Sequence, residues 1–205
     1  MLTLVGRISP ELGATVVDHP QPAAYVVGGR GRRVVVTTGA VHALTGPELA
    51  AVLAHERAHA AGRHDLLLDG ARLLEKAFPR VLLFGTARSQ LCRLVEMRAD
   101  EVATSHHAPI SLARAMVTIA TAAATSSVPA SPVLAGSVAA TGGDAMERLN
   151  RLLTPPVPLR RASQVAIGAG VAALAFVPAA FLVAAQFLPM LSACPPLSLL
   201  PSLPS

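Results

Sequence analysis

The sequence predicts an α+β fold that is mainly helical, with a small β-hairpin or sheet near its start and a transmembrane helix near its end. Apolar stretches flank a glycine-rich turn early in the chain, several stretches with helical patterns follow, and no charged residue occurs from residue 162 to the end. With 52% hydrophobic residues, 14% charged residues and a mean hydropathy of +0.53, the chain is more apolar than most soluble proteins.

The hairpin is the first predicted element. The stretches "AAYVV" (23–27) and "RRVVVTT" (32–38) are rich in β-branched residues, and they flank "GGRG" (28–31). A glycine-rich turn between two such stretches is typical of a β-hairpin, because glycine adopts the backbone angles that tight turns require.

A helix with the most informative motif of the chain follows the hairpin. In "LTGPELAAVLAHERAHA" (44–60), Thr45 and Glu48 have the spacing of a capping box, and Pro47 suits the first helical turn. The apolar face of this helix consists of Leu49, Val52 and Leu53.

The later helices are expected at about 64–78, 88–106, 111–125 and 144–153. The helix expected at 111–125 overlaps an uncharged run over 115–143, which Pro129 and Pro132 interrupt. Because proline breaks helices, we interpret this run as a packed helix followed by a loop.

The apolar run 164–191 is long enough to cross a bilayer of roughly 30 Å as a helix. Arg160 and Arg161 precede it, with Arg148 and Arg151 further back, whereas the tail has no cation. By the positive-inside rule we expect a single-pass protein of the cell membrane whose N-terminal domain faces the cytoplasm. The predicted parts are a catalytic domain (1–157), a basic linker (158–163), the transmembrane helix (164–191) and a short tail (192–205).

The net charge of +5 comes almost wholly from arginine, since Lys76 is the only lysine. Membrane topology explains this charge. Aromatic residues make up only 3% of the chain and no nucleic-acid motif occurs, so we expect no nucleic-acid partner. The two cysteines, Cys92 and Cys194, do not indicate a disulfide framework.

The helix at 44–60 contains the sequence HExxH, which predicts a zinc site. His55 and His59 are four residues apart and therefore lie on one helical face, where two imidazoles can bind one Zn²⁺ ion. Glu56 lies beside that face, where it can take a proton from a water molecule that zinc activates.

Two acids compete as the third ligand. Asp65 completes the pattern HExxHxxGxxD, which resembles a metzincin site, but the residues after His64 look like renewed helix and no Met-turn follows. Glu96 in "LVEMRADEVA" (94–103) is paired at helical spacing with Asp100, which could hold a ligand imidazole. Glu75 is a weaker alternative because it has no acid four residues later.

The set HExxH then ExxxD resembles the membrane-bound gluzincin zinc metallopeptidases, which include HtpX-like, CAAX-protease-like and BlaR/MecR-type families. The likeness is strongest to the BlaR/MecR type, through "HERAHAAGRHD" (55–65) and "VEMRADEVA" (95–103), and it covers about residues 23–153. Most members carry transmembrane helices before the peptidase domain and some carry an extracellular sensor domain, whereas here we expect the peptidase domain almost at the start and only a short tail after the transmembrane helix.

The resemblance implies a zincin-like metallopeptidase domain. It implies that the zinc ligands are His55, His59 and Glu96 and that Glu56 is the general base. It also implies that Asp100 orients a ligand histidine and that Asp65 is a structural acid. The strand "VVVTT" would form the sheet edge that pairs with an extended substrate.

The sequence therefore predicts a membrane-anchored zinc endopeptidase that hydrolyses peptide bonds of protein or peptide substrates, and that contacts the lipid bilayer. One alternative is a non-catalytic membrane adaptor that keeps the metallopeptidase fold. Another is a secreted metzincin-type protease that uses Asp65.

Overall fold

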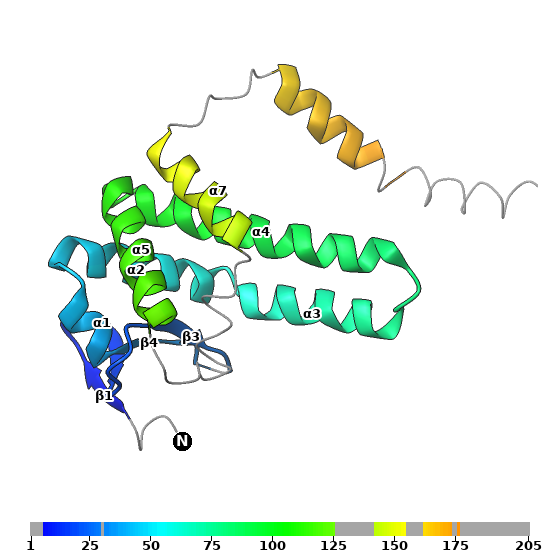
Figure 1. Cartoon of the computed structure of the whole chain (residues 1–205). Coiled ribbons are helices and arrows are strands. Elements are labelled where there is room, and N and C mark those ends of the chain that lie inside the picture. Colours follow the sequence, from blue (N-terminus) through cyan, green and yellow to red (C-terminus); the bar gives the residue numbers. More distant parts are fainter. Residues whose placement is uncertain (1–5, 30, 126–141, 155–161, 174–175, 177–205) are drawn as a thin grey trace, which may run out of the picture. The chain divides into compact units, whose positions relative to one another are not determined.

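The structure is a computed structural model that describes residues 6–29, 31–125, 142–154, 162–173 and 176. The chain divides into two compact units, Met1–Pro155 and Pro156–Ser205 (Figure 1). The first unit holds the sheet and the helices described below, and its composition confirms the predicted fold class of a mainly helical domain with a small sheet.

The sheet has four strands, β1 (Gly6–Ser9), β2 (Ala14–Val17), β3 (Ala24–Val27) and β4 (Arg33–Thr37), in the order β1-β2-β4-β3. Strands β3 and β4 form the predicted antiparallel hairpin, with Tyr25 opposite Val35. Gly29 lies in the turn at a φ of 121°, a backbone angle that favours glycine.

The predicted position of "VVVTT" at the sheet edge is wrong. Strand β4 pairs with β3 on one side and, in parallel, with β2 on the other. The cause is the pair of short N-terminal strands, which the sequence analysis did not predict. Val35 and Val36 are fully buried as a result. The edges of the sheet are β1 and β3.

Six helices of the first unit follow or flank the sheet in the described part of the chain. They are α1 (Thr38–Ala43), α2 (Gly46–Ala61), α3 (His64–Ala77), α4 (Leu82–Thr104), α5 (Pro109–Thr125) and α7 (Gly142–Leu153). The capping box is present at the start of α2, where the backbone N–H of Thr45 donates to Glu48 Oε2 over 2.9 Å. Helix α4 begins six residues before the predicted start at residue 88, directly after the turn that contains Pro79.

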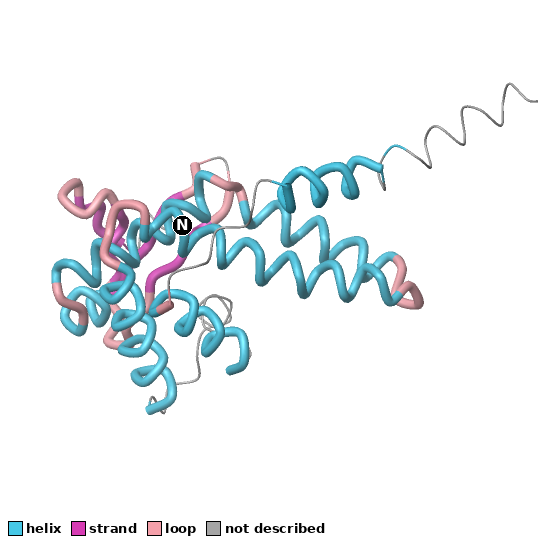
Figure 2. Tube along the Cα trace, turned by 90° about the horizontal axis from the view of Figure 1, so that it is seen from above, coloured by secondary structure: helices cyan, strands magenta, loops and turns pink. Residues whose placement is uncertain are grey.

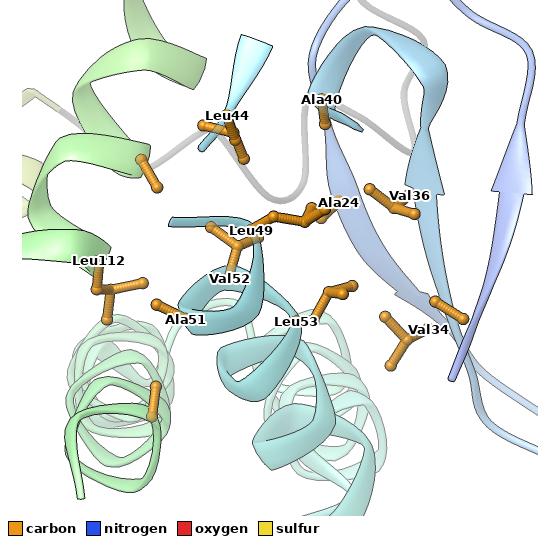
Figure 3. Close-up of a cluster of buried hydrophobic side chains, with 13 residues drawn as sticks. Ala24, Val34, Val36, Ala40, Leu44, Leu49, Ala51, Val52, Leu53 and Leu112 are labelled. Carbon is orange, nitrogen blue, oxygen red and sulfur yellow. The ribbon is translucent and has the colours of Figure 1, made fainter. Parts of the chain in front are cut away.

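Helix α2 packs against the sheet on one side and against other helices on the other (Figure 3). Leu53 lies near Val34 of β4, whereas Ala51 points toward Leu112 of α5. The buried cluster that these contacts form removes apolar surface from water, which is the main source of its stability. Burial on both sides fixes the helix that contains the HExxH motif.

Helices α3 and α4 lie side by side as a helical hairpin that a short turn connects (Figures 1 and 2). Within the second unit, residues 162–173 are helical and exposed. Most of the predicted transmembrane helix, 164–191, lies outside the described residues, and so does the tail. In the part that is described, no helix combines the length and the apolar character needed to cross a membrane. The transmembrane helix stays a prediction.

Candidate metal centre

Three potential metal ligands meet where α2 crosses α4. His55 and His59 lie one turn apart on α2, and their Nε2 atoms are 3.0 Å from each other. Glu96 of α4 directs its carboxylate at both rings, with Oε2 3.5 Å from His55 Nε2 and Oε1 3.4 Å from His59 Nε2. Among the described residues, this is the one group of three or more potential ligands whose donor atoms converge.

The geometry fits a tetrahedral zinc ion. Ligand atoms that lie about 2.0–2.2 Å from such an ion are ~3.3–3.6 Å from one another, close to the distances found here. Two imidazoles and one carboxylate are also a ligand set that zinc accepts in catalytic sites, where its fourth position stays open. The residues present could therefore hold Zn²⁺.

The charges of the site are arranged to attract a cation. Burial by itself would lower the pKa of His55, but the carboxylates of Asp100 and Glu96 outweigh burial and raise that pKa to about 9. Burial likewise opposes ionisation of Glu96, yet His55, His59 and Arg148 hold the pKa of its carboxyl well below its usual range.

Asp100 lies one helical turn after Glu96 and approaches the other side of His55. Its Oδ1 is 2.9 Å from His55 Nδ1, although the direction of this approach does not give a hydrogen bond in the structure. The carboxylate is thus on the side of the ring that faces away from Glu96, where a group that fixes the imidazole is expected.

Arg148 of α7 completes this arrangement, and sequence reasoning missed its role. Its guanidinium donates from Nε and Nη2 to the two oxygens of Asp100, over 2.8 and 2.7 Å. Its Nη1 lies 2.7 Å from Glu96 Oε2. In the sequence Arg148 is one of the cations near the predicted membrane helix, and nothing in a short amphipathic helix marks one arginine as buried.

Glu56 is buried beside His55 and faces the same cavity as the candidate ligands. Burial raises the pKa of its carboxyl, while the nearby His55 and His59 oppose the shift. A carboxylate with a raised pKa is a better proton acceptor, which suits a general base.

The alternative ligand Asp65 lies outside the converging group. It is in the first turn of α3, where its Oδ1 accepts from Arg32 Nε over 2.8 Å, and this contact holds its pKa below the usual value. Asp65 thereby connects the start of α3 to the β-hairpin. Glu75 pairs with Arg88 at 3.1 Å. The geometry favours Glu96 over both.

His64 is a second residue that sequence reasoning missed. Its Nδ1 is 2.8 Å from Nδ1 of His59, and its ring is buried. In the sequence, His64 marks only the start of a predicted helix.

An apolar cavity of about 280 Å³ adjoins the three candidate ligands and Glu56. Helices α5 and α7 supply most of its wall, and Ala24 of the edge strand β3 also borders it. The apolar side chains of the wall include Val52, Leu112, Met116, Ile119, Met146 and Leu149. The cavity therefore offers space for an apolar group next to the site.

Residues 4–88 match the family model of peptidase family M48. The match confirms the resemblance to gluzincin-type metallopeptidases and supports a metallopeptidase function for the chain. It includes His55, Glu56 and His59 and ends before Glu96, so the assignment of Glu96 depends on the geometry above. No solved structure matched the chain.

Proposed function

We propose that this metallopeptidase-related chain is a membrane-anchored, zinc-dependent endopeptidase. The observation that carries the proposal is the convergence of His55, His59 and Glu96 beside a buried glutamate in the position of a general base. In this proposal His55, His59 and Glu96 bind Zn²⁺, Asp100 orients His55, and Arg148 keeps both carboxylates of α4 in place.

The proposed reaction is the hydrolysis of a peptide bond by water. When bound, zinc would supply a Lewis acid that lowers the pKa of a water molecule toward about 7. Glu56 accepts the proton of the attacking water on its carboxylate and afterwards gives it to the leaving amine. The ion pair with Arg148 favours the ionised form of Glu96, which a metal ligand requires.

The edge strand β3 supports the recognition of an extended substrate. Thr37 of β4 donates its backbone N–H to the carbonyl of Ala23, and hydrogen-bonded pairs alternate along an antiparallel ladder. The backbone groups of Tyr25 therefore face β4, and those of Ala24 and Val26 face the open edge. A substrate strand that paired there would pass the cavity that Ala24 borders.

The cavity supports a preference for an apolar residue beside the scissile bond. Apart from the site residues at one end, its wall consists almost wholly of aliphatic side chains and methionine. A charged substrate side chain would lose its hydration there without gaining a partner. Unfolded or membrane-associated protein segments, which expose apolar residues, are the substrate class that fits.

The α3–α4 hairpin supports the membrane attachment. Its exposed apolar side chains are Leu66, Leu67, Leu73 and Leu74 on α3 and Phe78, Val81, Leu82 and Leu83 at the tip. The charged residues Asp69, Arg72 and Lys76 lie on another side of α3, as helical spacing requires. An exposed apolar stripe flanked by cations is typical of a helix that lies in the interface of a bilayer.

The proposal is tested with the parent chain, Glu56→Gln and Glu96→Ala in detergent. Zinc content and cleavage of an unfolded, fluorescently labelled protein are measured, and the products are sequenced. We expect the parent to hold about one zinc ion per chain and to cut next to apolar residues. We expect Glu56→Gln to keep the metal and lose activity by at least about 100-fold, because the proton acceptor is gone.

The control is Glu101→Ala, which removes an exposed carboxylate of the same helix that pairs only with Arg98 in the described structure. It should leave both readouts unchanged. A parent that binds zinc but cuts no more than Glu56→Gln would favour the non-catalytic adaptor. Loss of zinc in Asp65→Ala but not in Glu96→Ala would overturn the ligand assignment.

A further inference from the structure

We infer that His64 is a positioning residue of the metal centre that holds the zinc ligand His59 through a hydrogen bond between the two imidazole rings. The inference rests on the proposed zinc site, since it concerns how one ligand of that site is held. Neither the match to residues 4–88 nor the sequence pattern assigns a role to this histidine.

The geometry joins the two rings directly. His64 Nδ1 lies 2.8 Å from His59 Nδ1, and the ring planes are perpendicular with centroids 4.7 Å apart. His59 directs its other nitrogen, Nε2, toward His55 and Glu96. His64 therefore contacts the ligand on the side that faces away from the metal position.

The direction of this hydrogen bond follows from the chemistry of imidazole. A neutral ring carries one hydrogen, so a His59 that offers the Nε2 lone pair to zinc keeps its hydrogen on Nδ1. That N–H must donate, and Nδ1 of His64 must accept. His64 is then neutral with its hydrogen on Nε2. Metal-bound histidines generally donate to a carboxylate or carbonyl, and here an imidazole takes that place.

The backbone between the two histidines is shaped to bring His64 back onto His59. Arg63, between α2 and α3, has a φ of 50° and is the single non-glycine residue with a positive φ in the described chain. Such a conformation costs about 1 kcal/mol or more for a non-glycine residue, and it persists only where surrounding contacts require it.

Gly62 provides the space for the ring. A Cβ atom at this position would lie 2.4 Å from Nε2 of His64, far closer than atoms can approach. The glycine of the HExxHxxG pattern therefore serves the packing of His64, and does not serve to bring Asp65 to the metal. The contact between His64 and His59 therefore depends on three successive residues: Gly62, the left-handed Arg63 and the buried His64 itself.

Asp100 and His64 divide the positioning between them. Asp100 approaches Nδ1 of His55, and His64 contacts Nδ1 of His59. Each candidate zinc-binding ring thus has a polar side chain beside its Nδ1, one from α4 and one from α3. The two groups differ in charge, because the carboxylate of Asp100 is negative and the neutral imidazole of His64 is not. His64 can therefore orient His59 without adding a negative charge to the site.

The test measures zinc affinity by competition with a chelator in the full chain, for the parent, His64→Leu and His64→Asn. Leucine removes the acceptor, whereas the Oδ1 of asparagine takes the position of the histidine Nδ1. We expect His64→Leu to weaken zinc binding by about 10- to 100-fold and His64→Asn to restore most of it. Asp65→Asn, which alters the neighbouring contact with Arg32, is the matched control and should leave the affinity unchanged.

A double-mutant cycle tests the role of Gly62. Gly62→Ala should weaken zinc binding in the parent and much less in the His64→Asn background, because asparagine lacks the Nε2 atom that the new methyl group meets. The nitrogen-15 NMR spectrum of the zinc-loaded parent should show a hydrogen on His59 Nδ1 and on His64 Nε2.

Two results would overturn the inference. One is a His64→Leu variant that binds zinc as tightly as the parent. The other is a spectrum with the hydrogen of His64 on Nδ1. A parent that binds no zinc would instead refute the proposed function, so the two failures are distinguishable.

Discussion

At the scale of single residues, the site depends on the positive charge of Arg148, which is distant in sequence from the carboxylates that it contacts. Asp100 and Glu96 are carboxylates one turn apart on α4, and both lie close to Arg148. Neighbouring carboxylates repel one another, and the burial of Asp100 and partial burial of Glu96 oppose their ionisation, so without the arginine their charges would be unfavourable. The guanidinium satisfies three of their four oxygens with planar, charge-assisted contacts.

Arg148→Met is predicted to lower the free energy of unfolding of the metal-free chain by about 3 kcal/mol, because it leaves a buried carboxylate without its partner. Urea unfolding measures this change. Arg98→Met is the control, since Arg98 pairs with Glu101 on the exposed face of α4 and such pairs contribute about 1 kcal/mol or less. Equal losses in both variants would contradict the importance of the buried pair.

At the scale of elements, different helices of the first unit supply different parts of the site. Helix α2 presents HExxH because its capping box fixes its start and its apolar residues pack against the sheet and α5. Helix α4 adds Glu96 and Asp100, and α7 adds Arg148 and part of the cavity wall. The hairpin of α3 and α4 extends beyond the contacts that the site requires, and its tip is apolar and exposed.

The exposed tip leads to a prediction about membrane contact. Leu82 is 87% exposed at the start of α4, and a tryptophan there is expected to be quenched by brominated lipid when the full chain is reconstituted in bilayers. Leu94→Trp, at an exposed position of the same helix further from the tip, is expected to be quenched much less. Fluorescence of both variants checks this, and equal quenching would contradict insertion of the tip.

At the scale of the whole molecule, the proposed function requires that the catalytic unit be held near a membrane. The apolar run 164–191 predicts a transmembrane helix, and the arginines before it predict the orientation. An anchored peptidase meets its substrates at high local concentration, since both are confined to one surface. In this proposal the described residues 6–29, 31–125 and 142–154 supply the catalytic part of the arrangement.

The predicted topology places Cys92 and Cys194 on opposite sides of the membrane. In intact cells, a membrane-impermeant maleimide is expected to label a Cys92→Ser variant at Cys194. A Cys194→Ser variant, which retains Cys92, should react only after permeabilisation. Alkaline carbonate should not extract the chain from membranes. Release by carbonate, or labelling of both variants only after permeabilisation, would contradict a single span with an external tail.

The sequence by itself determined the parts of this protein whose signals are local. The capping box, the HExxH motif and the β3–β4 hairpin each occupy a short stretch, and the structure shows the box and the hairpin where they were predicted. The pairing of Glu96 with Asp100 was also visible, because helical spacing alone puts both on one face. The resemblance to gluzincins drew on the same local patterns.

Only the tertiary structure decided which distant residues meet. Arg148 reaches Asp100 across 48 residues of sequence, and β2 joins β4 to remove "VVVTT" from the edge of the sheet. His64 turns back onto His59 because Arg63 adopts a left-handed conformation and Gly62 has no Cβ atom to obstruct the ring, which no periodic pattern reveals. Such contacts form where helices and strands pack against one another. Which residues meet there depends on the arrangement of these elements in space, and this arrangement cannot be read from a short stretch of sequence.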